Sequence, residues 1–590
     1  MNFSPPPPLE VEFIAEWILC NEKLQENPSE ALNYCEAAYR LKPSRSVVES
    51  LMNAAFMADK RDVLKQLIRK LPEGSLQRIE AEALLSFLSF DYPKFTELGE
   101  KALERGTENV VLLITLNAYA AKTGMPNLFK QSLKRLYEIY PQNDKLFEIL
   151  LKVSTPEERI KLLEQRLERK PSKKYLLELV KLLNENGERE KALRYLQKGL
   201  EYFPSLGGKY IGELLLLGRT EEAYRYAERT GDLDTFYDKA FEVAELYGNA
   251  KLLRFLEEKL LEHPSEKYLG RLLLDLMAFN FDAKEVGRVG EEFLKVANLK
   301  NPASREVAEA YAVWSFLHGN SLPPTEFETV KKLVELAKAI KENKLDTAEH
   351  LFAELKGKLK GYPFAVYKAL KPYFYYKKGF KPSKLFETFT ETELLTSASE
   401  LYDFDRKYAE DILRAYLTED NSPKAFSAVF QIAYDHGDIS FISQIFRKAV
   451  QLYPDNPHFL NAYAYTLLEL KGREATGEAC PLLEKAYKLS KDNGAIADSL
   501  AWCYYLEGKI DRAYRLLKKL NKKGEPVLEY HFAEVLRKRG KPCEALKFVK
   551  SALEDLNGYP KPPEPGLKEK LQRLEEELKN LCGSHSKSNL

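Results

Sequence analysis

The stretch LAWCYYLEGKIDRAYRLL at residues 500–517 is followed by FAEVLRKRGKPCEALKFV at residues 532–549. Each begins with an apolar residue and an alanine, and each carries a glycine that precedes a second alanine by five residues. A glycine at this spacing is typical of a helix end and a short turn before the next helix. We therefore predict that each stretch is one helix–turn–helix unit.

The same unit recurs along the chain with a regular period. The alanines Ala479, Ala513 and Ala545 are 34 and 32 residues apart. Seven residues after Ala479 and Ala545 stand two more small residues, Ala486 and Ala552, on the same helix face, because seven residues make about two turns. Small side chains on that face let two helices approach closely. The glycine–alanine spacing occurs at Gly187/Ala192, Gly218/Ala223, Gly508/Ala513 and Gly540/Ala545.

This pattern resembles the tetratricopeptide repeat (TPR), a unit of about 34 residues with the motif L-G-x2-Y and then A-x3-F. The match is clearest in residues 457–556 and divergent elsewhere. The departures are the family tryptophan, which is replaced by Leu460, Ala497 and Glu529, and the family glycine, which is alanine in all three copies. The matching segments are Tyr463-Ala464-x2-Leu467, Leu500-Ala501-x2-Tyr504 and Phe532-Ala533-x2-Leu536.

The resemblance implies an all-α fold: a right-handed superhelical solenoid of antiparallel helix pairs, with a C-terminal helix. Helix pairs in such arrays stack to share one core, and the first helices line a concave face. We expect these segments: a Pro-rich stub (1–8), a divergent N-terminal TPR-like array (9–264), a degenerate helical-repeat region (265–420), a regular C-terminal TPR array (421–556), a Pro-rich linker (557–566), a capping or coiled-coil helix (567–582) and a disordered tail (583–590).

Composition and motifs exclude several functions. Lys and Arg number 90 and Asp and Glu 89, so the net charge is +1 and nucleic acid is not the expected partner. The sequence contains no GxxxxGK[ST], HExxH or GxSxG motif, and its seven histidines are scattered. We therefore predict a protein that is not an enzyme, with no catalytic residue, no metal site and no cofactor.

The six cysteines form no CxxC motif and stand where a helix needs a small apolar residue. We interpret them as buried reduced thiols, which fits a reducing, cytoplasmic compartment. The alternative is a periplasmic or membrane-associated bacterial protein whose signal peptide was removed. No stretch approaches the roughly 20 apolar residues of a membrane helix. High Lys and Glu with few His and Met is a weak sign of a thermophile.

The first candidate site is the concave face of the three regular repeats. Residues opposite the small packing residue of each first helix should point into the groove, where aromatic side chains make good anchors for a partner. The alternative is that these residues pack adjacent first helices together. They are Asn461, Tyr465, Asp498, Trp502, Tyr505, Tyr530, Glu534 and Arg537.

The second candidate is the lysine-aromatic segment, residues 355–385, which holds nine Lys and no Asp or Glu. Lysines interleaved with aromatic rings suit single-stranded nucleic acid. The alternative is an aromatic core flanked by solvated lysines, neutralised by the acidic stretch 387–411. The candidate surface comprises Lys371, Tyr375, Lys377, Lys378 and Lys381.

The third candidate is the tail, where leucines recur at heptad spacing through residues 567–581. They predict either a helix that caps the last repeat or a seam for dimerisation. The five leucines are Leu567, Leu571, Leu574, Leu578 and Leu581.

The resemblance implies a protein-interaction scaffold or adaptor that binds a protein or peptide segment in its concave groove. The second hypothesis is an RNA-associated helical-repeat protein that uses the lysine-aromatic segment. The third is a bacterial envelope assembly factor. Binding that depends steeply on salt would distinguish the second hypothesis from the first.

Overall fold

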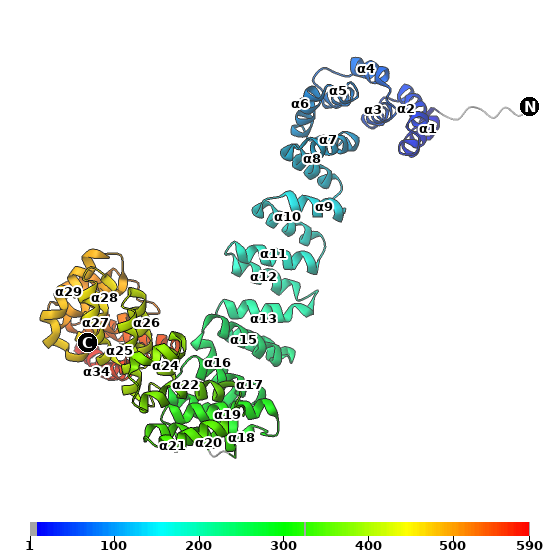
Figure 1. Ribbon diagram of the computed structural model, residues 1–590. Helices are drawn as coiled ribbons and strands as arrows, with labels where there is room; N and C mark the ends of the chain where they lie inside the picture. The colour runs from blue at the N-terminus through cyan, green and yellow to red at the C-terminus, as the bar shows by residue number, and fades with distance from the viewer. Residues whose placement is uncertain (1–8, 322, 324–325, 589–590) are drawn as a thin grey trace, which may run out of the picture. The chain divides into compact units, whose positions relative to one another are not determined.

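The computed structural model describes residues 9–321, 323 and 326–588, so the predicted Pro-rich stub lies outside the described residues. The chain divides into two compact units, Met1–Leu206 and Gly207–Leu590. The described residues are α-helical with short 3-10 turns and contain no strand, which confirms the all-α prediction. Figure 1 shows the helices following one another in chain order within each unit.

The first unit is a stack of short helices, and buried apolar residues of α1–α8 form one core. Its α-helices are α1 (Leu9–Lys23), α2 (Pro28–Leu41), α3 (Arg45–Met57), α4 (Arg61–Lys70), α5 (Leu76–Leu88), α6 (Tyr92–Glu104), α7 (Val110–Thr123), α8 (Pro126–Ile139), α9 (Asp144–Val153), α10 (Pro156–Arg169), α11 (Lys173–Glu185) and α12 (Arg189–Gly199), before the 3-10 turn Pro204–Leu206.

The second unit begins with the same architecture. Its first helices are α13 (Gly207–Leu216), α14 (Thr220–Thr230), α15 (Leu233–Tyr247), α16 (Ala250–Glu262), α17 (Glu266–Ala278), α18 (Ala283–Val296), α19 (Pro302–Leu317), α20 (Glu328–Lys341), α21 (Leu345–Leu355), α22 (Gly361–Lys377), α23 (Pro382–Thr388) and α24 (Glu391–Glu400).

The unit then continues through the regular repeats to the last helix. These helices are α25 (Arg406–Glu419), α26 (Pro423–Asp435), α27 (Ile439–Leu452), α28 (Pro457–Lys471), α29 (Thr476–Leu489), α30 (Gly494–Leu506), α31 (Ile510–Lys518), α32 (Pro526–Lys538), α33 (Pro542–Asp555) and α34 (Leu567–Ser588), with 3-10 turns at Gly472–Ala475 and Leu556–Gly558.

The glycines of the repeat pattern stand at the turns, as their spacing predicts. Gly508 and Gly540 have φ of 83° and 77°, a left-handed conformation that costs other residues energy because of their Cβ. The alanines that follow, Ala513 and Ala545, are fully buried at 0% exposure. The turn is thus set by the glycine, and the close approach of the helices by the alanine.

Successive helix pairs stack through their first helices. The helix α30 contacts both α28 and α32, and each of these three also packs on its own second helix. This is the arrangement of helix pairs that the period of about 34 residues predicts. The boundary between the two compact units, after Leu206, falls inside the array predicted for residues 9–264. The finer segment boundaries stay predictions.

The last helix, α34, lies against the repeats. Leu567, Leu571, Leu574 and Leu578 are at most 3% exposed, whereas Leu581 is 41% exposed. Because α34 packs on α33 and α32, the leucine seam is used within the chain, as a capping helix requires. Helix α34 runs to Ser588, past residue 583 where the predicted tail begins, and residues 589–590 lie outside the described residues, so the tail boundary stays a prediction.

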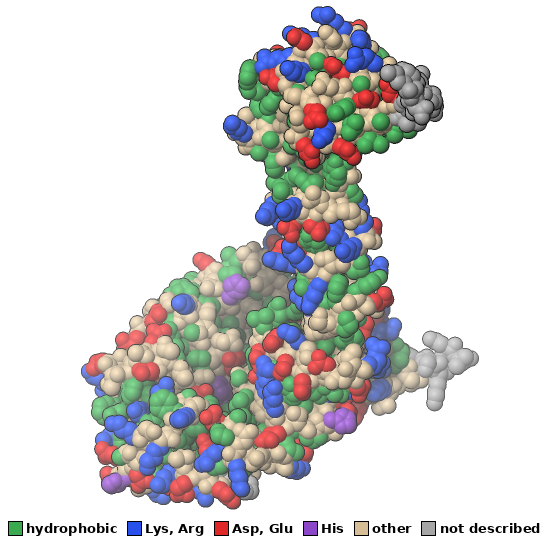
Figure 2. All heavy atoms as spheres, turned by 90° about the vertical axis from the view of Figure 1, so that its right-hand side faces the viewer, with side chains coloured by type: hydrophobic (Ala, Val, Ile, Leu, Met, Phe, Trp, Pro, Cys, Tyr) green, Lys and Arg blue, Asp and Glu red, His purple; other side chains and the backbone are tan. Residues whose placement is uncertain are grey.

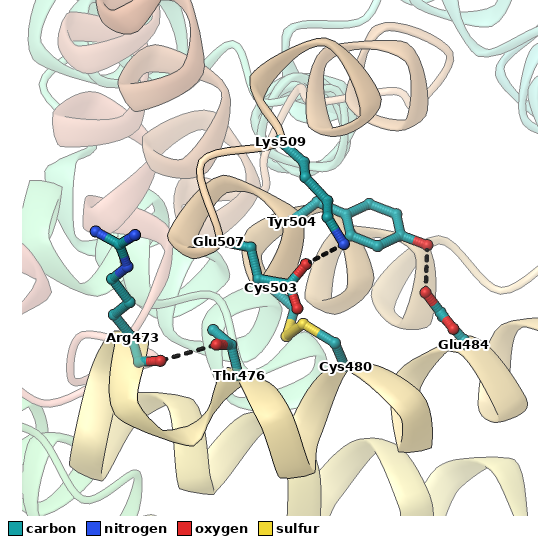
Figure 3. Close-up of a disulfide and its surroundings, with 8 residues drawn as sticks. All are labelled: Arg473, Thr476, Cys480, Glu484, Cys503, Tyr504, Glu507 and Lys509. Carbon is teal, nitrogen blue, oxygen red and sulfur yellow. Dashed lines mark hydrogen bonds and ion pairs between the residues drawn. A yellow bond between two sulfur atoms is a disulfide. The ribbon is translucent and has the colours of Figure 1, made fainter.

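The interpretation of the cysteines as reduced thiols is wrong. All six are paired, as Cys20–Cys35, Cys480–Cys503 and Cys543–Cys582, with Cα atoms 4.9, 5.7 and 4.9 Å apart. Each bridge joins cysteines on two neighbouring helices, and no CxxC spacing in the sequence indicates that these cysteines lie close together. Figure 3 shows the bridge between α29 and α30, flanked by the hydrogen bond from Tyr504 to Glu484 (2.9 Å) and the ion pair Lys509–Glu507 (2.6 Å).

Candidate functional site

The predicted groove residues lie on α28, α30 and α32, and we call the side of these helices that carries them the inner face. At its centre, the Trp502 ring stacks on His531 with centroids 4.1 Å apart and on Tyr505 at 4.7 Å. Tyr530 touches the same indole at a tilt, 5.7 Å away. Trp502 is only 8% exposed, so this aromatic stack also holds the first helices α30 and α32 to one another.

A buried chain of polar groups runs beside the stack. Asp498 Oδ1 lies 2.8 Å from His531 Nδ1, and His531 Nε2 lies 3.4 Å from the Tyr465 hydroxyl. Tyr465 in turn donates a hydrogen bond to Glu564. A protonated imidazole donates from both nitrogens, so a charged His531 satisfies Asp498 and Tyr465 at once.

The outer end of the face is an ionic cluster. Tyr505 donates to Glu534 (2.7 Å), and Arg537 pairs with the same carboxylate at 2.8 Å. Arg537 also binds Glu577 on α34 at 2.9 Å. The predicted groove residues at this end are therefore already bonded within the chain.

The Pro-rich linker crosses this face. We call residues 556–566 the strap. Its Glu564 is 5% exposed and receives the Tyr465 hydrogen bond, and Tyr434 on α26 donates to the carbonyl of Pro563. Tyr559 donates to the carbonyl of Gly524 at 3.1 Å. The strap therefore contacts the repeats along its length. It does so through a backbone carbonyl, the Glu564 carboxylate and the Tyr559 hydroxyl.

The start of the strap is held by α16 and its neighbours. Arg254 donates to the carbonyls of Asn557 and Tyr559, each at 2.7 Å, and to that of Pro560 at 3.3 Å. Glu285 orients the guanidinium through contacts of 3.0 and 3.2 Å. Lys561 reaches Asn280 at 3.1 Å. The strap therefore joins two parts of unit 2 that are about 300 residues apart in sequence.

An apolar pocket lies open beside the strap. Its volume is about 530 Å³, and it is bordered by α26, α27, α28, Glu564 and Pro565. Phe430, Phe446 and Phe459 supply its aromatic walls. Asn461 also lines it, and the side-chain oxygen of Asn461 is buried without a hydrogen-bond partner. A buried acceptor left unpaired is costly, so this oxygen favours a ligand that carries a donor.

Burial sets the electrostatics of the strap contact. Burial, reinforced by the charge of Glu469, raises the pKa of Glu564 to about 7. Burial disfavours a charged His531, but the Asp498 carboxylate beside it, together with the charges of Glu564 and Glu469, outweighs burial, and the pKa of His531 is raised. Burial also lowers the pKa of Lys561. Of these three groups, Glu564 therefore changes its charge close to neutral pH.

The lysine-aromatic segment forms α22 and the start of α23, and its rings are used internally. Tyr373 donates to Asp405 and Tyr376 to Asp411, both at 2.6 Å. Tyr375 packs edge-on against Phe380, with centroids 5.3 Å apart. Lys371 and Lys378 lie over the rings of the residues four positions before them, Lys377 pairs with Asp405, and Lys381 is exposed.

The acidic stretch thus supplies partners for this segment, as the alternative interpretation expects. Figure 2 shows basic and acidic side chains interspersed over the face turned to the viewer. That face has no broad field of one sign of the kind that binds a phosphate backbone. Of the five candidate residues, four contact neighbouring rings or a carboxylate, and Lys381 is exposed.

Several residues of the site were not predicted from the sequence. His531 occupies the position next to Tyr530, and its partners come from other helices. The segment Pro562-Pro563-Glu564-Pro565 reads in the sequence as a stiff linker, and nothing local in it indicates that Glu564 is buried against α28. Arg254 and Tyr434 gave no sequence signal, because their partners lie 303 and 129 residues away.

The helix pairs of residues 457–556 have the arrangement that the TPR pattern predicts, and the described residues form an all-α array of helix pairs. No family model matches the chain. It is 38% identical over 87 residues to the "TPR repeat-containing protein PA4667" of Pseudomonas aeruginosa. That match covers 15% of this chain and 14% of the relative, so the chain aligns with a small part of that protein.

Solved helical-repeat structures also align along the chain. Yeast Tom70 is 12% identical, covering 98% of this chain and 97% of its own, with a TM-score of 0.27. A structure titled Naa15/Naa10 bound to HypK-THB is 13% identical, covering 97% of this chain and 80% of that one, with a TM-score of 0.23. Whole-length superposition is therefore poor. Among the described helices, none is long and apolar enough to cross a membrane.

Proposed function

We propose that this protein is a non-enzymatic interaction scaffold that binds a segment of a partner protein on the inner face of α26, α28, α30 and α32. The observation that carries the proposal is the open apolar pocket beside the strap. It offers three aromatic walls and the unpaired oxygen of Asn461. Aromatic pockets with one or two placed polar groups suit the anchoring residues of a protein ligand.

The predicted groove residues enter this proposal in two roles. Asn461 and Tyr465 line the open pocket. The remaining six residues hold α30, α32 and α34 together and so fix the shape of the face. The wall of the pocket thus rests on helices that are themselves bonded to one another, which limits the ordering cost of binding.

Site-specific photo-crosslinking in the native cells tests the proposal. A benzoylphenylalanine replaces Ala462, a pocket residue, and in a control it replaces the exposed Ala365 on α22. We expect one defined protein adduct from position 462 that is absent from position 365. In the same cells, Phe446→Ala should reduce the adduct. No adduct, or equal adducts at both positions, would reject the binding site.

We further propose that the scaffold works in an oxidising compartment, such as the bacterial periplasm. All six cysteines are paired, and disulfides persist mainly outside the reducing cytoplasm. This favours the envelope hypothesis over the cytoplasmic one, with hyperthermophile cytoplasm as the exception. Fractionation of the native cells, with thiol labelling of each fraction, tests it. Recovery of the protein in the cytoplasm with free thiols would reject the proposal.

A further inference from the structure

We propose that the inner face of the C-terminal repeats is a receptor for an extended, proline-rich segment carrying one glutamate, and that the strap is its intramolecular ligand. A partner segment of the same chemistry would compete with the strap for this face. The inference rests on the proposed function and names the class of partner that the face accepts.

The contacts made to the strap are those of peptide recognition. Tyr434 on α26 binds a proline carbonyl, and Tyr465 on α28 binds the glutamate, which lies 99 residues further along the chain. A proline-rich segment has few N–H donors and a stiff backbone, so it presents mainly carbonyl acceptors at low entropic cost. Hydroxyl donors from tyrosines on the receptor helices match that surface.

The glutamate is the specific element. Glu564 is 5% exposed, and burying a carboxyl group costs free energy unless its hydrogen bonds are satisfied. A strap that served only to hold α34 in place would dock at lower cost with an apolar side chain there. The receptor instead presents the Tyr465 hydroxyl, backed by His531 and Asp498, at the bottom of the contact.

The geometry also leaves room for a competitor. The open pocket is bordered by Glu564 and Pro565 themselves, so it continues the strap's path on α26 and α28. A segment that enters the pocket first can displace the strap from this end. The strap's opposite end stays anchored by Arg254, and Cys543–Cys582 keeps α34 on α33.

The test opens the receptor without removing any helix. In the full-length chain, residues 559–566 are replaced by a Gly/Ser segment of equal length, and the disulfide to α34 is retained. The probe is a fluorescein-labelled peptide with the sequence LNGYPKPPEPG of residues 556–566, capped at both ends. We expect the opened chain to bind it at least tenfold more tightly than the intact chain does, measured by fluorescence anisotropy.

Two matched changes locate the recognition. A peptide with alanine in place of glutamate, and a receptor with Tyr465→Phe, should each bind about tenfold more weakly, the usual effect of losing one hydrogen bond to a charged or buried group. A scrambled peptide of the same composition is the control. An opened chain with native helical content that binds no peptide, or binds the alanine and glutamate peptides equally, overturns the proposal.

If the opened chain does not fold, the proposal is tested on the intact chain by hydrogen exchange. Millimolar peptide should speed hydrogen exchange at the displaced end of the strap, at the amides of Glu564, Gly566 and Leu567, and the alanine peptide should not. Unchanged exchange overturns the proposal. Peptide binding without an adduct at position 462 would retain this receptor and reject the scaffold role, and an adduct without peptide binding would do the reverse.

Discussion

Tyr465 on α28 donates a hydrogen bond to Glu564, 99 residues further along the chain, and this contact places the strap on the inner face of the repeats. The two residues are parts of one chain of polar groups that reaches Asp498 through His531. The face that the sequence marks for a partner is therefore partly covered by the protein itself.

The stability of unit 2 should fall as pH rises through neutrality. The pKa of Glu564 is raised from 4.5 to about 7, so the stability that its neutral form contributes is fully present below pH 4.5 and is lost as pH rises through 7. The raised pKa of His531 acts in the same direction. We expect Glu564→Gln, which stays neutral, to remove about 2 kcal/mol of the fall between pH 5 and pH 8.

Urea unfolding at the two pH values, followed by circular dichroism, measures this difference. Glu554→Gln is the control, because Glu554 is an exposed glutamate on α33. Its pH dependence should equal that of the wild type. A Glu564→Gln chain that loses as much stability as the wild type would show that Glu564 is not neutral in the folded protein.

Removing the bridge between α33 and α34 should loosen the end of the chain. Cys543 and Cys582 enclose a separation of 39 residues, for which loop-closure entropy gives a stabilisation of about 2–4 kcal/mol. Cys543→Ala with Cys582→Ala should therefore make residues 557–588 sensitive to protease. The matched control, Cys20→Ala with Cys35→Ala, removes the bridge of unit 1. Equal protease patterns in the two double variants would argue that packing alone holds α34.

One glycine of α18 should not tolerate a methyl group, whereas another should. A Cβ at Gly290 would overlap the ring of Tyr311, while one at Gly287 meets nothing nearer than 3.6 Å. We expect Gly290→Ala to destabilise by about 1–3 kcal/mol. Gly287→Ala should be neutral or stabilise by up to about 1 kcal/mol, because alanine favours helix. Thermal unfolding of the two variants tests this prediction, and similar melting temperatures would contradict the packing of Gly290 against Tyr311.

The helical repeats could be predicted because their signals are local. Gly508 and Ala513 are five residues apart, and the turn and the close helix contact follow from those two side chains. The groove residues could be placed on one face for the same reason, since helical spacing alone puts Asp498, Trp502 and Tyr505 together.

The contacts between distant segments could not be predicted in this way. The pairing of Cys480 with Cys503 depends on how α29 lies against α30, and the docking of the strap depends on Arg254, about 300 residues earlier. The strap contact depends on how many stacked pairs lie between its two partners, because small rotations between successive pairs add up and no single motif encodes their sum. The partner of the leucine seam could not be predicted either, since one apolar stripe can pack against a neighbouring repeat or against a second chain equally well.

Arg254 should be irreplaceable by lysine at the start of the strap. Its planar guanidinium donates to the carbonyls of Asn557 and Tyr559 at 2.7 Å while Glu285 holds it from behind, a fork that a single ammonium cannot reproduce. We expect Arg254→Lys to speed hydrogen exchange at residues 556–561 at least tenfold and to leave α28–α33 unchanged. Arg225→Lys, at an exposed position on α14, is the control and should alter neither segment. Because charge is conserved in both variants, faster exchange in Arg254→Lys alone would assign the effect to the geometry of the fork, and no change would show that the strap is held from its Glu564 end.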